Sequence, residues 1–264
     1  MADDIFVASD ASVNSSSDDE LPRMSELPDN VGHRFAKKIL DLPDEVALEE
    51  EKDRKLKIKI HRCSDRVCGY GTFGNTRICC VVLTPVNEAD AEDFEAGVTV
   101  SITGAAYVSK IAMRDIISYM IPSAKLKRTF IDIRFSVYSD SGCVIPTALS
   151  TAMLTLSASK IDVKGVVTAA TVLVNPQGEL TVSPGRVLEE KVRDKTPGFG
   201  YVTAVKIMRD PHVRWYDTEG LVRRKQFEAA MSKACEEATN AYDHMASMLQ
   251  HLAANSSADE VHCG

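Results

Sequence analysis

The glycine-rich segment at residues 69–74 is the first part of the sequence that could do chemistry. Gly69, Gly71 and Gly74 match the G-x-G-x-x-G pattern of loops that bind a dinucleotide. That function needs a helix directly after the loop, because N–H groups at its N-terminus hold the pyrophosphate. The residues that follow, TRICCVVLT, predict a strand instead. Protein kinases use a glycine loop between strands, but no His-Arg-Asp or Asp-Phe-Gly follows here. We therefore expect a turn between two strands.

Cysteine and histidine side chains are the second candidate, as metal ligands. His61, Cys63 and Cys68 have the spacing H-x-C-x4-C, but a tetrahedral site needs a fourth ligand. Cys79 and Cys80 are adjacent in a predicted strand, so they point to opposite faces and cannot both join it. We predict no metal site and no cofactor. The seven cysteines have no framework spacing, which indicates reduced thiols in an intracellular protein.

Basic side chains form local clusters that could bind a polyanion. They are Lys125, Lys127 and Arg128 in the first cluster, Arg223, Arg224 and Lys225 in the second, and Arg209 with Arg214. Ordinary solvated surface also explains such groups, whereas a channel that holds a polyanion by its backbone requires them.

Charge is unevenly distributed along the 264 residues. The whole chain has 38 acidic and 31 basic side chains, and residues 1–54 alone have 15 acidic and 6 basic ones. This segment is poor in apolar residues, so we expect a largely disordered acidic extension at 1–54. A folded domain at 55–254 and a flexible tail at 255–264 would complete the chain. The N-terminus lacks the features of a secretory signal, and no apolar stretch is long enough to span a membrane.

Hydrophobic periodicity predicts an α/β (α+β) domain with mixed sheets, packed helices and a long C-terminal helix. Strands are expected at residues 55–61, 76–84, 98–102, 128–138, 166–174, 180–182, 201–208 and 212–216. Helices are expected at 106–121 and 147–159. In the last helix, apolar residues from Phe227 to Leu252 recur in steps of four and three. This stripe packs on the domain or, alternatively, contacts a partner.

The order of several short motifs resembles the RNase PH family. Residues 74–77, Gly-Asn-Thr-Arg, with an apolar strand and Thr-Pro at 84–85, resemble that family's GNT-strand-GP motif. Asp-Ser-Gly at 140–142 is similar to its Asp-Gly-Gly turn, and Glu-Glu at 189–190 to its acidic pair. Asp-Thr-Glu-Gly at 217–220 leads into the terminal helix, as in the family. The resemblance covers about residues 55–254 and implies an RNase PH-like fold.

The resemblance also implies that the chain is catalytically inert. Family members are phosphate-dependent 3′→5′ exoribonucleases or inert ring subunits of the RNA exosome. Active members have Thr-Arg after the Asp-Gly-Gly turn, where they bind the attacking phosphate, and an Asp just beyond the following hairpin. Here Cys143 and Val144 stand at the first place and Ser183 at the second. A thiol, an isopropyl group and a hydroxyl lack the charge for these tasks.

As a family member, the chain would be a structural and RNA-guiding subunit of the exosome. Its expected partners are another RNase PH-like subunit in a heterodimer within a hexameric ring, RNA-binding cap subunits and single-stranded RNA. On this hypothesis the candidate RNA-binding residues are Lys125, Lys127, Arg128, Arg223 and Arg224. Residence in the nucleus, including the nucleolus, and in the cytoplasm is also expected. The alternatives are an active phosphorolytic exoribonuclease that uses Asp140, Glu189 and Glu190, or an unrelated α/β protein-interaction module.

Overall fold

The computed structural model describes residues 54–63, 65–83, 97–122, 130–208, 212–220 and 222–259, the side chains of 253–259 excepted. The chain divides into two compact units, residues 1–42 and 43–264, and every described residue belongs to the second. Residues 1–53 of the expected extension and residues 260–264 of the expected C-terminal tail lie outside the described residues. So does the cluster of Lys125, Lys127 and Arg128. The domain boundaries at 54 and 254 stay predictions.

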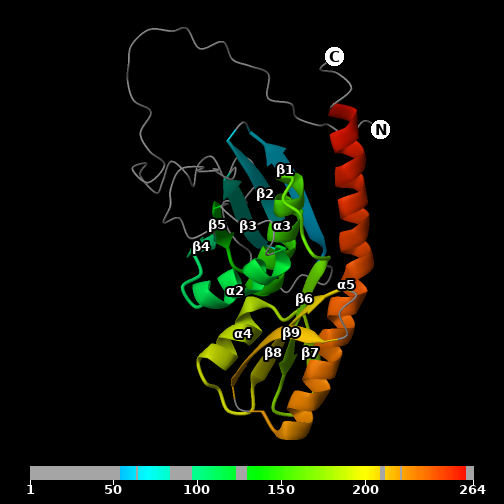
Figure 1. The fold of residues 1–264 in the computed structure, drawn as a ribbon. Helices are drawn as coiled ribbons and strands as arrows, with labels where there is room; N and C mark the ends of the chain where they lie inside the picture. The colour runs from blue at the N-terminus through cyan, green and yellow to red at the C-terminus, as the bar shows by residue number, and fades with distance from the viewer. Residues whose placement is uncertain are drawn as a thin grey trace, which may run out of the picture. The chain divides into compact units, whose positions relative to one another are not determined.

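A five-stranded sheet comes first in the chain (Figure 1). Its strands are β1 (Leu56–Arg62), β2 (Arg66–Phe73), β3 (Thr76–Leu83), β4 (Gly97–Thr103) and β5 (Phe130–Ser139), in the order β1-β2-β3-β5-β4. Neighbouring strands are antiparallel, except that β4 and β5 are parallel. A parallel pair needs a crossover connection, and α2 (Lys110–Met120) lies on it.

The second sheet has four antiparallel strands and is associated with the remaining helices. These strands are β6 (Val167–Val174), β7 (Leu180–Val182), β8 (Gly200–Ile207) and β9 (Val213–Gly220), in the order β7-β6-β8-β9. The helices are α3 (Val144–Ala158), α4 (Arg186–Arg193) and α5 (Arg224–Asp259). No described helix combines the length and apolarity needed to cross a membrane.

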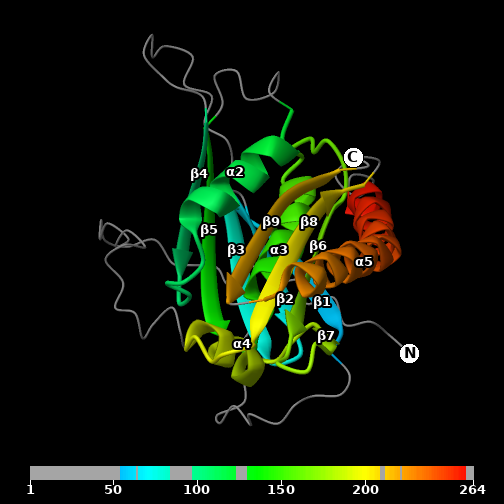
Figure 2. The same ribbon diagram turned by 90° about the horizontal axis from the view of Figure 1, so that it is seen from below.

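Helix α3 lies between the two sheets and is buried almost all round (Figure 2). It has no charged side chain, and its threonines satisfy their hydroxyls within the helix. Thr151 Oγ1 donates to the Thr147 carbonyl at 2.7 Å, and Thr155 Oγ1 to the Thr151 carbonyl at 2.7 Å. Helix α5 packs along β6 and β8, and its stripe of small and apolar residues is at least partly buried. The packed alternative for this helix is confirmed.

Three local predictions need correction. Gly69 and Gly71 lie in strand β2, and only Gly74 and Asn75 form the turn. The glycines are needed because α3 crosses closely, so that a Cβ at Gly71 would clash with Thr151 Oγ1. The first predicted helix begins at Lys110, four residues later than expected, because Ser109 caps its N-terminus. Helix α4 was not predicted at all.

Candidate functional site

The N-terminus of α3 is the place where the sequence resemblance puts phosphate binding. Cys143 precedes the helix in a left-handed conformation, with φ of 58°, and its side chain makes no cap. Its backbone N–H donates instead to Glu189 Oε1 of α4, at 2.8 Å. A helix N-terminus favours an anion because its N–H groups are unpaired. Here the anion is a side chain of the same molecule.

Glu189 belongs to a closed network of charged and polar groups. Its Oε2 accepts a bond from Arg193 at 2.7 Å, and Arg193 also lies 3.9 Å from Asp140 Oδ2. The Tyr107 hydroxyl donates to that same Asp140 oxygen at 2.8 Å. The Arg193 guanidinium stacks on the Tyr107 ring, 3.6 Å from its centroid. Helix α4, the loop between β4 and α2 and the loop between β5 and α3 thus meet at the ion pair of Glu189 and Arg193.

Burial sets the protonation of this network. Glu189 is only 5% exposed, and this desolvation raises the pKa of its carboxyl from 4.5 to about 7. The Cys143 N–H and the Arg193 guanidinium act in the opposite direction, whereas Asp140 raises the pKa further. Burial and the Asp140 carboxylate also raise the pKa of the Tyr107 hydroxyl, so that it stays a donor.

The network leaves little room for a ligand. The space lined by Tyr107, Cys143, Glu189 and Arg193 has a volume of about 20 Å³. A void of this size holds about one water molecule. Val144 and the Cys143 thiol are also buried, and burial raises the pKa of that thiol. A phosphate ion would have to displace the Glu189 carboxylate in order to reach the helix N-terminus.

The Arg54 side chain holds two adjoining loops together and forms the Arg54 clamp. The Arg54 guanidinium donates to the carbonyls of Ser183 and Pro184, at 2.9 and 2.8 Å, and to that of Ser141, at 2.7 Å. It also lies over the Phe73 ring, 4.8 Å from the centroid. Arg54 therefore fixes the turn before α3 against the loop after β7. The sequence offered no signal for this role, because the partners are backbone carbonyls far along the chain.

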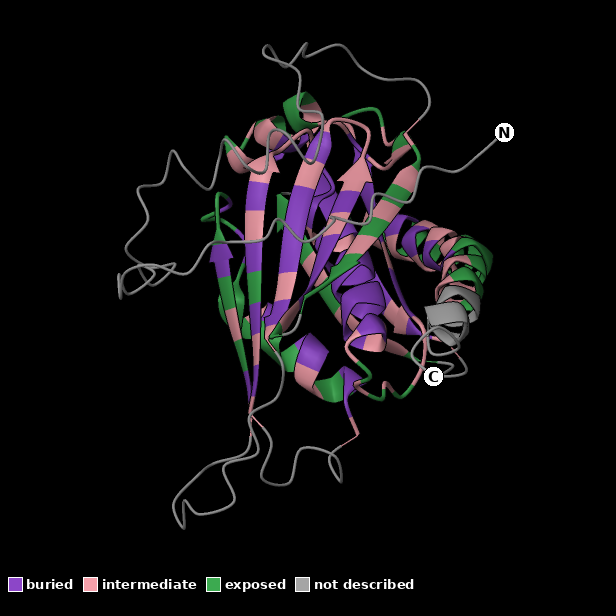
Figure 3. Cartoon of the chain, turned by 90° about the horizontal axis from the view of Figure 1, so that it is seen from above, coloured by how far each residue is buried: buried purple, intermediate pink, exposed green. Residues whose placement is uncertain are grey.

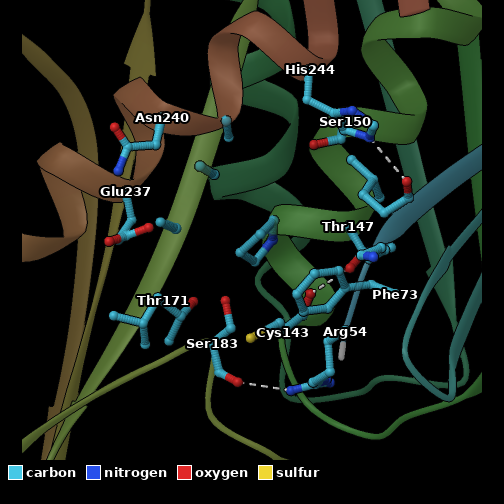
Figure 4. A pocket seen from close by; sticks show the side chains of 17 residues that line it. Arg54, Phe73, Cys143, Thr147, Ser150, Thr171, Ser183, Glu237, Asn240 and His244 are labelled. Carbon is cyan, nitrogen blue, oxygen red and sulfur yellow. Dashed lines mark hydrogen bonds between the residues drawn. The ribbon is translucent and has the colours of Figure 1, made fainter. Parts of the chain in front are cut away.

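A larger cavity of about 430 Å³ adjoins this clamp, and its volume lies in the range of small-molecule pockets. Glu237, Asn240 and His244 reach it from α5, and Ser150 reaches it from α3 (Figure 4). Ser183 lines it beside Arg54, at the position where active relatives of the resembled family have Asp. The lining therefore has cationic, acidic and amide groups.

Comparisons with known proteins bear on the fold. No family model matches the chain, and no curated protein matches it. Among solved structures, the crystal structure of Rrp46 from rice (Oryza sativa) superimposes with a TM-score of 0.64 at 14% sequence identity. The superposition covers 75% of this chain and 95% of the rice chain. The fold is RNase PH-like. The fold that the short motifs implied is thereby confirmed.

In this RNase PH-like fold, the residues of the enzymatic alternative are only partly brought together. Asp140 and Glu189 meet through Arg193. Glu190 does not join them, because its carboxylate pairs with Arg186 at 2.6 Å in a half-exposed position. Among the described residues, no group of three His, Cys, Asp or Glu side chains is placed to hold a metal ion.

Arg223 and Arg224, the predicted RNA-binding residues that the structure describes, do not line either space of this site. Arg223 and Arg224 are exposed where α5 begins, and they line a shallow open surface with Phe227. Arg224 pairs with Glu228 of the next helical turn at 2.9 Å. Their role in RNA binding stays a prediction.

Proposed function

We propose that this chain is a non-catalytic structural and RNA-guiding subunit of an exosome-like ring built from RNase PH-like chains. Its partners would be a second RNase PH-like chain in a heterodimer, RNA-binding cap subunits and single-stranded RNA. It would act in RNA processing and degradation in the nucleus, including the nucleolus, and in the cytoplasm. The RNase PH-like fold supports the kind of assembly, and the closed network at α3 supports the lack of catalysis.

The observation that carries the non-catalytic part is the bond from the Cys143 N–H to Glu189. Phosphorolysis needs a phosphate dianion held by charged donors at the attacking position. In this chain the N–H before α3 already holds a carboxylate. Of the guanidinium groups nearby, that of Arg193 binds the same carboxylate and lies 3.9 Å from Asp140, and that of Arg54 donates to the carbonyls of Ser141, Ser183 and Pro184. A second anion at this place would meet the carboxylates of Glu189 and Asp140.

The position beyond the hairpin supports the same conclusion. Ser183 has a left-handed backbone, with φ of 53°, and its carbonyl is bound by Arg54. Its hydroxyl lies at the edge of the larger cavity but carries no charge at neutral pH. A neutral hydroxyl is a poor general acid or base. Residue 183 thus lacks the carboxylate that proton transfer at this position would use, and the carboxylate that does line the cavity, Glu237, comes from α5.

Exposed apolar side chains are consistent with a place in an assembly. Ile111 of α2 is 66% exposed and Val187 of α4 is 46% exposed. A subunit of a closed heteromeric ring offers two different surfaces to its two neighbours. We infer that contacts in the ring cover at least one of these side chains.

Two experiments test the proposal. Purified protein is incubated with single-stranded RNA, Mg²⁺ and inorganic phosphate, beside an active phosphorolytic ribonuclease as positive control. We expect no phosphate-dependent release of nucleoside diphosphates, and such release would refute the inert role.

Gentle affinity purification from the native cell, followed by mass spectrometry, tests the ring. We expect several RNase PH-like chains and small RNA-binding proteins in near-equal amounts. Recovery of the chain alone, or as a self-assembled hexamer, would refute the ring.

A further inference from the structure

The outer face of the five-stranded sheet has a row of basic side chains. Side chains alternate between the two faces of a strand. On β1, every second residue from Leu56 to Ile60 packs against the core. Lys57, Lys59 and His61 therefore point to the opposite face, and all three are exposed. Helices α2 and α3 lie on the core side of the sheet, and no described helix covers the outer side (Figures 2 and 3).

Aromatic rings lie next to this row. Tyr70 of β2 packs edge-on against the His61 ring, with centroids 5.5 Å apart and planes at 78°. In the sheet register Tyr70 is opposite Cys79 of β3, whose thiol also interacts with Tyr138 of β5. Burial raises the pKa of Cys79 to about 12 and raises that of both phenols. The centre of the face is thus an uncharged, half-buried aromatic patch.

The charge of the face is positive. The basic side chains on this face are Lys57, Lys59, Arg66, Arg77 and Arg134. The acidic ones are Asp132 and, at the β1–β2 turn, Asp65. The two aspartates pair with Arg134 at 2.8 Å and with Arg66 at 3.1 Å. Within the described residues, Lys57 and Lys59 form no ion pair, so their ammonium groups are available to an anionic partner.

We propose that this outer sheet face binds single-stranded RNA. Lys57 and Lys59 bind successive phosphates, and Tyr70 stacks against a base. Two outward residues on one strand are about 6.7 Å apart, from a rise of 3.3–3.4 Å per residue, which is close to the separation of phosphates in an extended strand. Sheets bind single-stranded RNA in this way, by stacking bases on aromatic rings and holding the backbone with cations.

This site deepens the proposed function, on which the choice of RNA as the natural ligand rests. It is separate from the cluster of Arg223 and Arg224 at the start of α5. A double-stranded RNA hides the faces of its bases, so that stacking on Tyr70 requires an unpaired strand. The site therefore favours single strands over duplexes of the same length.

Fluorescence anisotropy with the full chain and a labelled oligouridylate tests the site. The Lys57→Gln/Lys59→Gln variant is expected to bind about 25-fold more weakly at 0.1 M salt. The slope of log K against log salt falls by about 1.4, because each single-strand phosphate contact contributes about 0.7. Tyr70→Ala is expected to bind the oligouridylate about fivefold more weakly or worse. Tyr70→Phe keeps the ring, and its affinity is expected to fall less than twofold.

The matched control is Lys110→Gln/Lys195→Gln, which removes the same charge from two exposed lysines away from this face and is expected to change affinity less than twofold. Arg223→Gln/Arg224→Gln is measured beside it, because these two arginines are the other described candidates for RNA binding. Circular dichroism must show native folding of every variant. The proposal is overturned if the sheet-face lysine variant keeps wild-type affinity and salt slope, or if only the arginine variant loses binding. Absence of RNA binding by the full chain also overturns it, and leaves an acidic protein segment as the occupant that this charge would favour.

The outcomes separate this proposal from the ring. Loss of the RNA site leaves recovery with other RNase PH-like chains unaffected, since affinity purification does not depend on Lys57 and Lys59. Conversely, a chain that purifies alone can still bind oligouridylate through the sheet face. The lysine variant should therefore be carried through both measurements.

Discussion

Replacing Glu189 by glutamine tests the buried network at the N-terminus of α3. The amide is almost the same size, and its oxygen can still accept the bond from the Cys143 N–H. It cannot ionise. In the wild type, burial raises the pKa of Glu189 to about 7, from 4.5 for an ordinary glutamate. The unfolded chain therefore ionises this group at a lower pH than the folded chain does.

The consequence is a loss of stability as the pH rises. A carboxyl whose pKa is raised by folding contributes its full stabilisation below the unfolded pKa of 4.5. This contribution falls as the pH rises from 4.5 and is lost once the pH has passed the folded pKa of about 7. Between pH 5 and pH 8 this costs the wild type about 2.5 kcal/mol, at 1.36 kcal/mol for each unit of pKa difference. Glu189→Gln has no such loss, so its free energy of unfolding relative to the wild type should improve by about that amount.

Urea denaturation of both proteins at pH 5, 6, 7 and 8 measures this difference. Losses that do not depend on pH, such as the weaker bond to Arg193, cancel between the pH values. Glu190→Gln is the matched control, because its half-exposed carboxylate is paired with Arg186 on the surface. That variant should stay within about 0.5 kcal/mol of the wild type. If the free energies of unfolding of Glu189→Gln and the wild type changed in parallel with pH, the raised pKa of the buried Glu189 carboxyl would be refuted.

Three further predictions concern packing, the clamp and catalysis. Gly71→Ala should destabilise the protein by about 1–3 kcal/mol in thermal or urea unfolding, because the new Cβ meets Thr151 Oγ1. Adding Thr151→Ala should recover part of that loss, and strict additivity of the two changes would contradict the contact. Arg54→Lys should cost about 2 kcal/mol, because one ammonium cannot bond the carbonyls of both loops; an unchanged urea midpoint would exclude the clamp. Cys143→Thr/Val144→Arg should not create phosphate-dependent release of nucleoside diphosphates, because Glu189 still occupies the backbone N–H of residue 143, and measurable release would show that this occupancy is not the barrier.

Several elements could be predicted because their cause is local. Strand β1 follows from strict alternation between Lys55 and His61, and β7 begins and ends where predicted because the turn at residues 175–178 precedes it. The long helix α5 follows from apolar steps of four and three. Each of these patterns is a property of neighbouring residues and requires no knowledge of what they pack against.

Other elements could not be predicted, because their cause is distant. Gly69 and Gly71 favour a turn when only the local sequence is considered. In the structure they lie in β2, where the absence of a Cβ lets α3 approach closely. Helix α4 is short and strongly charged, and it follows Pro184 and Gly185, so local propensity favoured a loop there. The family resemblance pointed to Glu189 in this helix. Its partner, the backbone N–H of Cys143, lies 46 residues away in the chain and could not be predicted.

By itself, the sequence determined the mixed α/β class, the long C-terminal helix and most of the strands, and hydrophobic period is enough for these conclusions. The expectation that residues 143, 144 and 183 are not catalytic came from the family resemblance and stays a prediction. Only the tertiary structure decided that Arg54 binds carbonyls about 90 and 130 residues away, and that Glu189 takes the N–H of Cys143. Such contacts depend on how separate elements pack, and spacing along the chain does not encode that packing. Burial in the packed structure then sets the pKa and the hydrogen-bond partners of each group.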